Sequence, residues 1–268
     1  MPTIAENKRE WDGAYSWTQQ GDEWSRPWGS VEMQWYASLL PRIQSHLPAQ
    51  TILEIACGFG RWTQYLMQHC DHLIAVDLSQ ECVDACRQRF GPRPGIEYHV
   101  NDGKSLEMVP SNSVDFIFSY DSLVHADASV LEAYLSQFSR ILTANGVAFI
   151  HHSNLGAYRT RYARVRRVPK LEGLLITLGA LDEFVHWRDP GVSAALVARL
   201  ADENGLRCIT QEVVHWRTKR AMIDCMSTIT KRGSTIERAN QLWMNDKFMS
   251  EAAYAASLTA HYLSAAPR

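Results

Sequence analysis

The stretch EIACGFGRW, residues 54–62, decides the fold of this chain. It completes the apolar, β-branched run TILEI at 51–55 and leads into RWTQYLMQHC at 61–70, where apolar residues recur at helical spacing. The predicted order is therefore strand, glycine turn, helix. Glycine lets the backbone approach a ligand closely, and the first amides of a helix have no intrahelical partner. This turn is the candidate ligand-binding element.

Outward from this turn, strand and helix patterns alternate along the chain. Further strands are predicted at 72–78, 96–100, 113–120, 147–152, 206–214 and 221–230. Further helices are predicted at 79–90, 128–142 and 192–205. This alternation is typical of an α/β fold with a parallel sheet covered on both faces. The short connection between the last two strands predicts that the sheet ends in an antiparallel pair.

Composition sets the broad class. The chain has 268 residues, 27 basic against 29 acidic side chains, and 46% hydrophobic residues. It is long enough for one large domain, and its near-neutral charge argues against nucleic acid as its main partner. The N-terminus has no apolar leader and no run of about 18 apolar residues exists, so we expect a cytoplasmic protein without a membrane partner. The six cysteines are expected to be reduced, and the helically spaced Cys82 and Cys86 lack the second pair of a zinc site.

The chain divides into regions by pattern. We expect an N-terminal helical lid or cap at 1–48, a core at 49–236 with a substrate-covering insertion at 154–190, and a helical tail at 237–268. Five tryptophans fall within the first 35 residues: Trp11, Trp17, Trp24, Trp28 and Trp35. Their rings suit stacking on a sugar or shielding a cation. The alternative is a hydrophobic clamp that ties the N-terminal segment to the sheet.

Three carboxylates stand at the ends of successive predicted strands. They are Glu54, Asp77 and Asp102. Asp77 lies 77 − 60 = 17 residues after Gly60, where a carboxylate can accept bonds from two ribose hydroxyls. Asp102 is placed to meet an adenine amine. The alternative interpretation is that all three are solvated loop carboxylates.

These motifs resemble those of the class I S-adenosylmethionine-dependent methyltransferases, over roughly residues 50–230. The one departure is Ala56, where the family has the first glycine of its turn. The resemblance implies a Rossmann-like, doubly wound, seven-stranded sheet, mostly parallel with an antiparallel terminal strand. Four strings, ILEIACGFGRWTQYL, FSYDSLVHAD, FIHHSNLGAY and GDEWSRPWGS, are similar to a bacterial group that modifies sugars and glycans.

The resemblance implies S-adenosylmethionine as cofactor and S-adenosylhomocysteine as product. Glu54 would lie near the methionine amine, Gly58 and Gly60 under the cofactor, Asp77 on the ribose and Asp102 at the adenine. The full set of cofactor-binding residues is expected to be Glu54, Ala56, Gly58, Gly60, Trp62, Asp77, Leu78, Asp102, Gly103 and Tyr120.

The candidate catalytic residues follow the fourth and fifth strands: Asp121, His125 and His152. A hydroxyl acceptor gains from a general base within hydrogen-bond distance, and histidine titrates near neutrality. Alternation sends His151 and His152 to opposite faces, and we favour His152 because it is nearer the rim. Asp121 with His125 and Asp127 could instead hold a divalent metal, but their spacing is not diagnostic and no metal is expected.

Substrate contacts are expected from Trp24 and Trp28 and from Arg161 and Arg164 in the insertion. Five arginines at 159–167 could grip a phosphate or carboxylate, or form a solvated helix face. The predicted function is methyl transfer to a hydroxyl of a small polar acceptor, a sugar or glycan-linked metabolite, by a monomer or homodimer.

Other functions stay open. N-methylation of a small amine or heterocycle needs less help from a base. A NAD-dependent oxidoreductase is disfavoured because Thr63 replaces the third glycine and Trp62 crowds the turn. A non-catalytic binding module is disfavoured by the intact Gly58 and Asp77. Nucleic-acid methylation is disfavoured because SYDS at 119–122 stands where such enzymes carry NPPY or DPPY.

Overall fold

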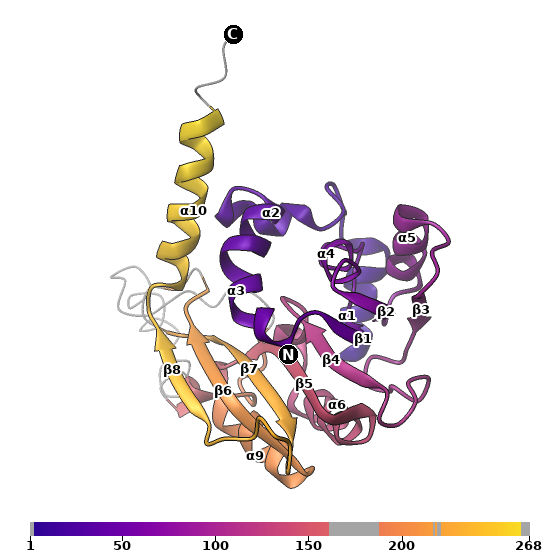
Figure 1. Cartoon of the computed structure of the whole chain (residues 1–268). Coiled ribbons are helices and arrows are strands. Elements are labelled where there is room, and N and C mark those ends of the chain that lie inside the picture. The colour runs from indigo at the N-terminus through magenta and orange to yellow at the C-terminus, as the bar shows by residue number, and fades with distance from the viewer. Residues whose placement is uncertain (1–2, 161–187, 217, 219–220, 264–268) are drawn as a thin grey trace.

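The structure is a computed structural model that describes residues 3–160, 188–216, 218 and 221–263. Its centre is one eight-stranded sheet with the order β3-β2-β1-β4-β5-β7-β6-β8 (Figure 1). The strands are β1 (Ala49–Ile55), β2 (Cys70–Asp77), β3 (Ile96–Val100), β4 (Val114–Ser119), β5 (Leu142–Ser153), β6 (Leu206–Val214), β7 (Asp224–Lys231) and β8 (Gln241–Asn245).

The pairing of the strands confirms the predicted fold class. All neighbouring strands are parallel except β7, which runs antiparallel to both β5 and β6. The chain order reverses between β1 and β4. In open α/β sheets, ligands bind at the carboxyl ends of the strands at such a switch point.

One strand, β8, was not predicted. It lies within 237–268, where a helical tail was expected, and it pairs in parallel with β6 at the sheet edge. The sequence QLWMN has no alternation of apolar and polar residues. A non-local ladder therefore stabilises this strand, and local sequence does not reveal it.

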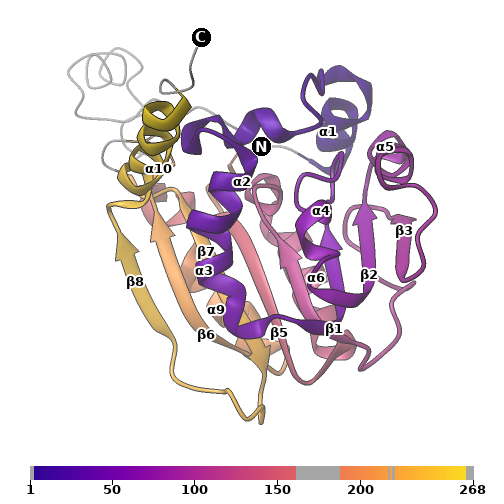
Figure 2. The same cartoon turned by 45° about the horizontal axis from the view of Figure 1, so that its top comes forward.

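Helices cover the sheet on both faces. They are α1 (Ile4–Arg9), α2 (Val31–Gln34), α3 (Leu40–Ile43), α4 (Thr63–Leu66), α5 (Gln80–Phe90), α6 (Ala128–Ile141), α9 (Ala194–Glu203) and α10 (Phe248–Leu263). Short 3-10 or π segments occupy Glu10–Ala14, Asp22–Trp28, Trp35–Leu39, Gln44–His46, Leu123–His125 and Leu155–Tyr158. Helices α3 and α4 lie on one side of the sheet, and α6 and α9 lie on the other (Figures 1 and 2).

The alternation of side chains along β1 divides the core into two layers. Leu53 and Ile55 belong to the cluster under α6 and α9. Ile52 faces the opposite cluster, which contains Trp35 and Leu39. This period-2 burial is what a strand covered on both faces requires. The sheet is therefore held rigidly between two apolar layers, with its strand ends free to carry a site.

The N-terminal segment crosses the carboxyl ends of the strands. Thr3 and Glu6 form a capping box that begins α1. The Asn7 amide donates to the carbonyl of His125, which is 118 positions away in the sequence. The side chain of Ile4 packs against Gly103. These contacts bring the start of the chain over the loops that follow β3 and β4.

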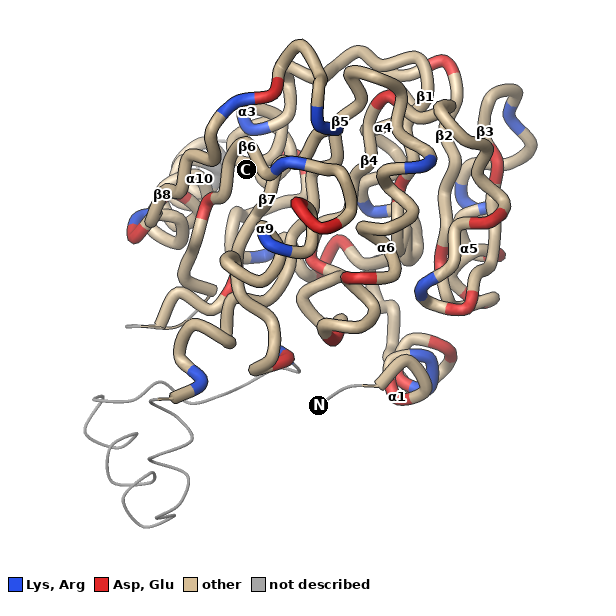
Figure 3. The backbone as a smooth tube through the Cα atoms, turned by 90° about the horizontal axis from the view of Figure 1, so that it is seen from below, with Lys and Arg blue, Asp and Glu red and all other residues tan. Residues whose placement is uncertain are grey.

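The outer surface carries mixed charge. On the side of α6 and α9, lysine and arginine positions are interspersed with aspartate and glutamate positions (Figure 3). Helix α10 projects from the body of the molecule (Figure 1). Among the helices that the structure describes, none combines the length and the apolar content needed to span a membrane.

Candidate active site

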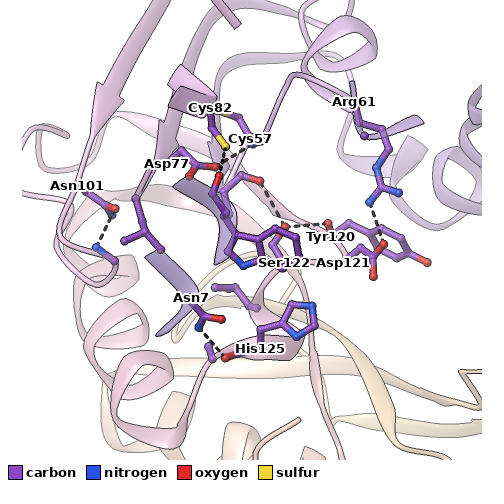
Figure 4. A pocket seen from close by; sticks show the side chains of 18 of the residues that line it. Asn7, Cys57, Arg61, Asp77, Cys82, Asn101, Tyr120, Asp121, Ser122 and His125 are labelled. Carbon is purple, nitrogen blue, oxygen red and sulfur yellow. Dashed lines mark hydrogen bonds and ion pairs between the residues drawn. The ribbon is translucent and has the colours of Figure 1, made fainter. Parts of the chain in front are cut away.

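A pocket lies at the carboxyl ends of β1, β2 and β4, at the switch point of the sheet (Figure 4). It encloses about 1140 Å³ of empty space, including open solvent at its mouth. The lining residues come from the glycine turn, the ends of β2 and β4, and the N-terminal segment. They include Trp11, Trp17, Trp24, Ala56, Cys57, Gly58, Phe59, Trp62, Asp77, Leu78, Gly103, Tyr120, Asp121 and His125.

The glycine turn has left-handed backbone at three alternate positions. Ala56 has φ +60°, Gly58 +55° and Gly60 +86°. Ala56 therefore keeps the conformation in which the family resemblance places a glycine, although it carries a Cβ. Gly60 is not among the pocket-lining residues. A Cβ there would lie 2.4 Å from the Phe90 ring, so this glycine lets α5 pack closely beneath the turn.

Glu54 lies beneath the turn with only 1% of its surface exposed. Its Oε2 accepts a bond from the Thr63 hydroxyl at 2.6 Å, and its Oε1 has no partner in the described part of the chain. Burial raises the pKa of Glu54 to about 8. A buried polar atom without a partner is costly, and Glu54 is not among the residues that line the pocket.

Asp77 ties β2 to the glycine turn. Its two carboxylate oxygens accept bonds from the amides of Gly58 and Ser79, both at 2.9 Å. Burial raises the pKa of the Asp77 carboxyl, and the amide bonds oppose that rise. Each carboxylate oxygen has a second lone pair, so these bonds leave acceptor capacity for a ligand in the pocket.

The expected role of Asp102 is wrong. Its side chain is exposed, and Oδ1 accepts the amides of Lys104 and Ser105 at 3.0 and 2.7 Å. The pocket is lined instead by its neighbours Asn101 and Gly103. Asp102 therefore closes the turn after β3. A loop can shift the facing residue by one position, which the sequence pattern does not reveal.

The preference for His152 is also wrong. His152 is fully buried outside the pocket lining, with Nδ1 2.9 Å from the Ser153 carbonyl and Nε2 2.7 Å from the Ser227 hydroxyl. A carbonyl only accepts, so Nδ1 carries the proton and Nε2 accepts from the serine. Burial lowers the pKa of His152 to about 4. Both ring nitrogens are occupied, and neither reaches the pocket.

His151 lies on the opposite face of β5 from His152, and it is fully buried outside the pocket lining. Its ring stacks on Tyr120 with centroids 4.6 Å apart, and its Nδ1 accepts the Asp121 amide at 3.2 Å. Behind it, Nε2 lies 3.5 Å from Asp224, which also binds Arg188 through two bonds of 2.9 and 2.7 Å. This buried chain of contacts supports the backbone of Asp121, which has φ +63°.

Asp121 and His125 both line the pocket after β4. The Asp121 carboxylate forms an ion pair with Arg61 Nη2 at 2.9 Å. His125 lies beside Trp11, with ring centroids 5.7 Å apart. The third residue of the metal alternative, Asp127, accepts the amides of Ser129 and Val130 and begins α6.

The aromatic residues of the N-terminal segment separate into two groups. Trp11, Trp17 and Trp24 line the pocket, and Trp17 stacks on Phe59 at 4.5 Å with planes 14° apart. Trp28 does not line the pocket. It is 1% exposed and packs against Trp216, so its expected substrate contact is wrong.

The predicted site residues and the residues that line the pocket are not the same set. Arg161 and Arg164 lie outside the described residues. Among those described, no group of three His, Cys, Asp or Glu side chains is placed to hold a metal. Sequence reasoning missed Asn7 and Arg61 as lining residues. Arg61 directly follows the second glycine of the turn, and that position was a signal for it.

Comparison with known proteins identifies the class of this domain. Residues 52–146 match the family model described as a methyltransferase domain. The PH0226 protein of Pyrococcus horikoshii OT3 superposes with a TM-score of 0.54 at 16% identity, over 78% of this chain and 99% of that one. A putative S-adenosylmethionine dependent methyltransferase from Listeria monocytogenes superposes with a TM-score of 0.52 at 14% identity, over 72% of this chain and 97% of that one. The fold is therefore that of the class I methyltransferases. The match over residues 52–146 supports the expected methyltransferase class, for which S-adenosylmethionine is the expected cofactor.

Two curated relatives match less than the whole chain. The S-adenosyl-L-methionine-dependent Diels-Alderase iccD of Talaromyces variabilis is 34% identical over 105 residues, which is 37% of this chain and 35% of the relative. The uncharacterized methyltransferase C70.08c of Schizosaccharomyces pombe is 24% identical over 175 residues, 61% of this chain and 63% of the relative. The chain thus spans between about a third and two thirds of these relatives.

The site has the chemistry that this cofactor requires. The turn at Gly58 brings bare backbone to the pocket, and a Cβ there would already meet the Trp17 ring at 3.4 Å. The unpartnered Glu54 Oε1 lies beneath the turn, outside the pocket lining, whereas Asp77 lines the pocket and is an acceptor for hydroxyls. Donor and acceptor groups of the described residues therefore fit S-adenosylmethionine.

Proposed function

We propose that this protein transfers a methyl group from S-adenosylmethionine to a hydroxyl of a small polar acceptor, a sugar or a glycan-linked metabolite. The observation that carries the proposal is one pocket that joins the glycine turn and Asp77 to Asp121, His125 and the three tryptophans of the N-terminal segment that line it. The cofactor supplies an electrophilic methyl on a sulfonium with an excellent leaving group. The protein then needs to position the acceptor and accept its proton.

His125 is the proposed general base. Of the two candidate histidines, His125 lines the pocket, whereas His152 lies within β5 and is fully buried. The Asp121 carboxylate is already paired with Arg61, so we assign it to positioning the acceptor end of the pocket. His125 would accept the proton of the acceptor hydroxyl, and the pocket would position that hydroxyl for methyl transfer.

We propose that the N-terminal segment, residues 1–48, acts as the lid. Trp17 stacks on Phe59 of the glycine turn, and Asn7 is bonded to the loop that carries His125. The indole faces of Trp11 and Trp24 are suited to a sugar ring and to a nearby sulfonium charge. Water exclusion by this lid would protect the reacting groups.

The proposal is tested in two stages. Calorimetry with S-adenosylhomocysteine is expected to show binding, and no binding at millimolar ligand would contradict the cofactor assignment. Purified protein with S-adenosylmethionine and a panel of sugars is then expected to yield a product heavier by one methylene in mass spectrometry. Methyl transfer itself must be measured, because one relative is named for a Diels–Alder reaction that depends on the same cofactor.

The base is tested on whichever acceptor reacts. His125→Asn is expected to lower kcat by about 10²–10⁴-fold without changing the affinity for S-adenosylhomocysteine. His152→Asn is the matched control, and any loss it causes should follow stability. A loss below about tenfold for His125→Asn would exclude the histidine base and favour N-methylation of an amine acceptor.

A further inference from the structure

Arg61 lines the pocket and holds an unused hydrogen-bond donor. It is 8% exposed and lies at the β4 end of the pocket, away from Asn101 and Asp77 (Figure 4). Its Nη2 is paired with Asp121 Oδ2, and its guanidinium carbon lies 4.6 Å over the Trp62 ring. Its Nη1 is buried and has no hydrogen-bond partner among the described residues.

A buried guanidinium nitrogen without a hydrogen-bond partner lowers the stability of the folded state. A buried charged donor without an acceptor costs more than a neutral one, and guanidinium presents its N–H groups as a rigid fork. Asp121 uses one nitrogen of that fork and offsets the charge, but it leaves the other unsatisfied. A planar carboxylate is the acceptor that matches the fork best.

A second orphaned atom lies at the other end of the same turn. Glu54 Oε1 is a buried acceptor without a partner, and Arg61 Nη1 is a buried donor without one. The two residues flank the glycine turn on either side. The Arg61 donor suits an anionic group, for which a neutral sugar has no counterpart.

We propose that Arg61 forms a carboxylate-binding subsite, with Nη1 as its principal donor. The carboxylate comes from one of two sources: the amino-acid end of the cofactor or an acidic group on the acceptor. This inference rests on the proposed function, because it places the subsite in the pocket where both molecules would meet. The same chemistry serves both sources, and ligands with and without the carboxylate distinguish them.

The test compares wild type with Arg61→Gln and Arg61→Lys. Arg42→Gln is the matched control, since Arg42 is also a mostly buried arginine paired with a carboxylate, Glu212, and it lies outside the pocket lining. Calorimetry measures S-adenosylhomocysteine and 5′-methylthioadenosine, which lacks the amino-acid end. Glucuronate and glucose are then titrated into the S-adenosylhomocysteine complex. Thermal melting monitors the fold of each variant.

A carboxylate from the cofactor predicts that Arg61→Gln weakens S-adenosylhomocysteine about 10- to 100-fold and leaves 5′-methylthioadenosine unchanged. If the acceptor supplies the carboxylate, Arg61→Gln should leave S-adenosylhomocysteine binding unchanged. It should then weaken the binding of glucuronate but not that of glucose. Arg61→Lys keeps the charge and should recover only part of either loss. The subsite would be overturned if each of the four ligands bound wild type and both Arg61 variants with the same affinity. Failure of wild type to bind S-adenosylhomocysteine would instead contradict the proposed function.

Discussion

Removing one carboxylate from the buried contacts behind the pocket should cost far more stability than removing an exposed one. Asp224 is fully buried, binds Arg188 through two bonds and approaches His151. Asp224→Asn would leave the Arg188 guanidinium buried without its counter-charge. Breaking such a pair typically costs about 3–5 kcal/mol. In a chain of this size, that corresponds to a fall in Tm of roughly 6–20 °C.

The dependence on pH follows from the same contact. Burial alone would raise the pKa of Asp224, but the Arg188 guanidinium outweighs it and holds that pKa well below the ordinary value of 3.8. The stability from a depressed carboxyl pKa is present above pH 3.8 and is lost as pH falls toward the folded-state value. The difference in stability between wild type and Asp224→Asn is therefore expected to persist from neutral pH to about pH 4.

Urea and thermal unfolding of both proteins measure this difference. Asp84→Asn is the matched control because Asp84 forms an exposed pair with Arg87, for which a change below about 0.5 kcal/mol is expected. The double variant Arg188→Met/Asp224→Leu removes both charges and should recover much of the loss. A loss below about 1 kcal/mol for Asp224→Asn would show that the pair is solvated or replaceable, and the argument for a dry support behind Asp121 would fail.

Two further outcomes follow from the site. Because burial raises the pKa of Glu54 to about 8, the folded state binds a proton that the unfolded state releases near pH 4.5, so wild-type stability should fall as pH rises between those values. Glu54→Gln should flatten this slope in urea titrations, and an unchanged slope would show that Glu54 is not its source. Trp28→Ala should lower the free energy of unfolding by about 3–5 kcal/mol without changing S-adenosylhomocysteine affinity. Trp17→Ala should instead weaken S-adenosylhomocysteine binding and leave the free energy of unfolding nearly unchanged. Calorimetry measures the affinity and thermal melting the stability, and the same pattern of effects in both variants would contradict this division.

The sequence predicts the backbone frame of the site better than its side-chain directions. The turn from Ala56 to Gly60 and the carboxylate of Asp77 lie where their pattern indicates, because a strand, a turn and a helix are local features. The choice between His151 and His152 depended on the phase of β5 relative to the sheet faces. Tertiary packing sets that phase, and Tyr120 and Asp224 determine it here.

Other differences have the same origin. Asn101 lines the pocket and Asp102 does not, because hydrogen bonds within the loop after β3 set the direction of each side chain. Strand β8 depends on pairing with β6, about 30 residues away, and its own sequence has no strand periodicity. Trp28 was grouped with Trp24 by proximity in sequence, but the 3-10 segment between them directs one ring to the pocket and the other to the core.

The division of the tryptophans also gives the protein an optical property. Trp11, Trp17 and Trp24 line the pocket, whereas Trp28 and Trp35 are sealed in the core. Indole emission responds to the polarity and the stacking partners of the ring. A ligand that enters beside the first three should change their emission, while the sealed rings contribute a constant background. The protein therefore carries its own fluorescent reporter of pocket occupancy, which needs no label and can follow binding in real time.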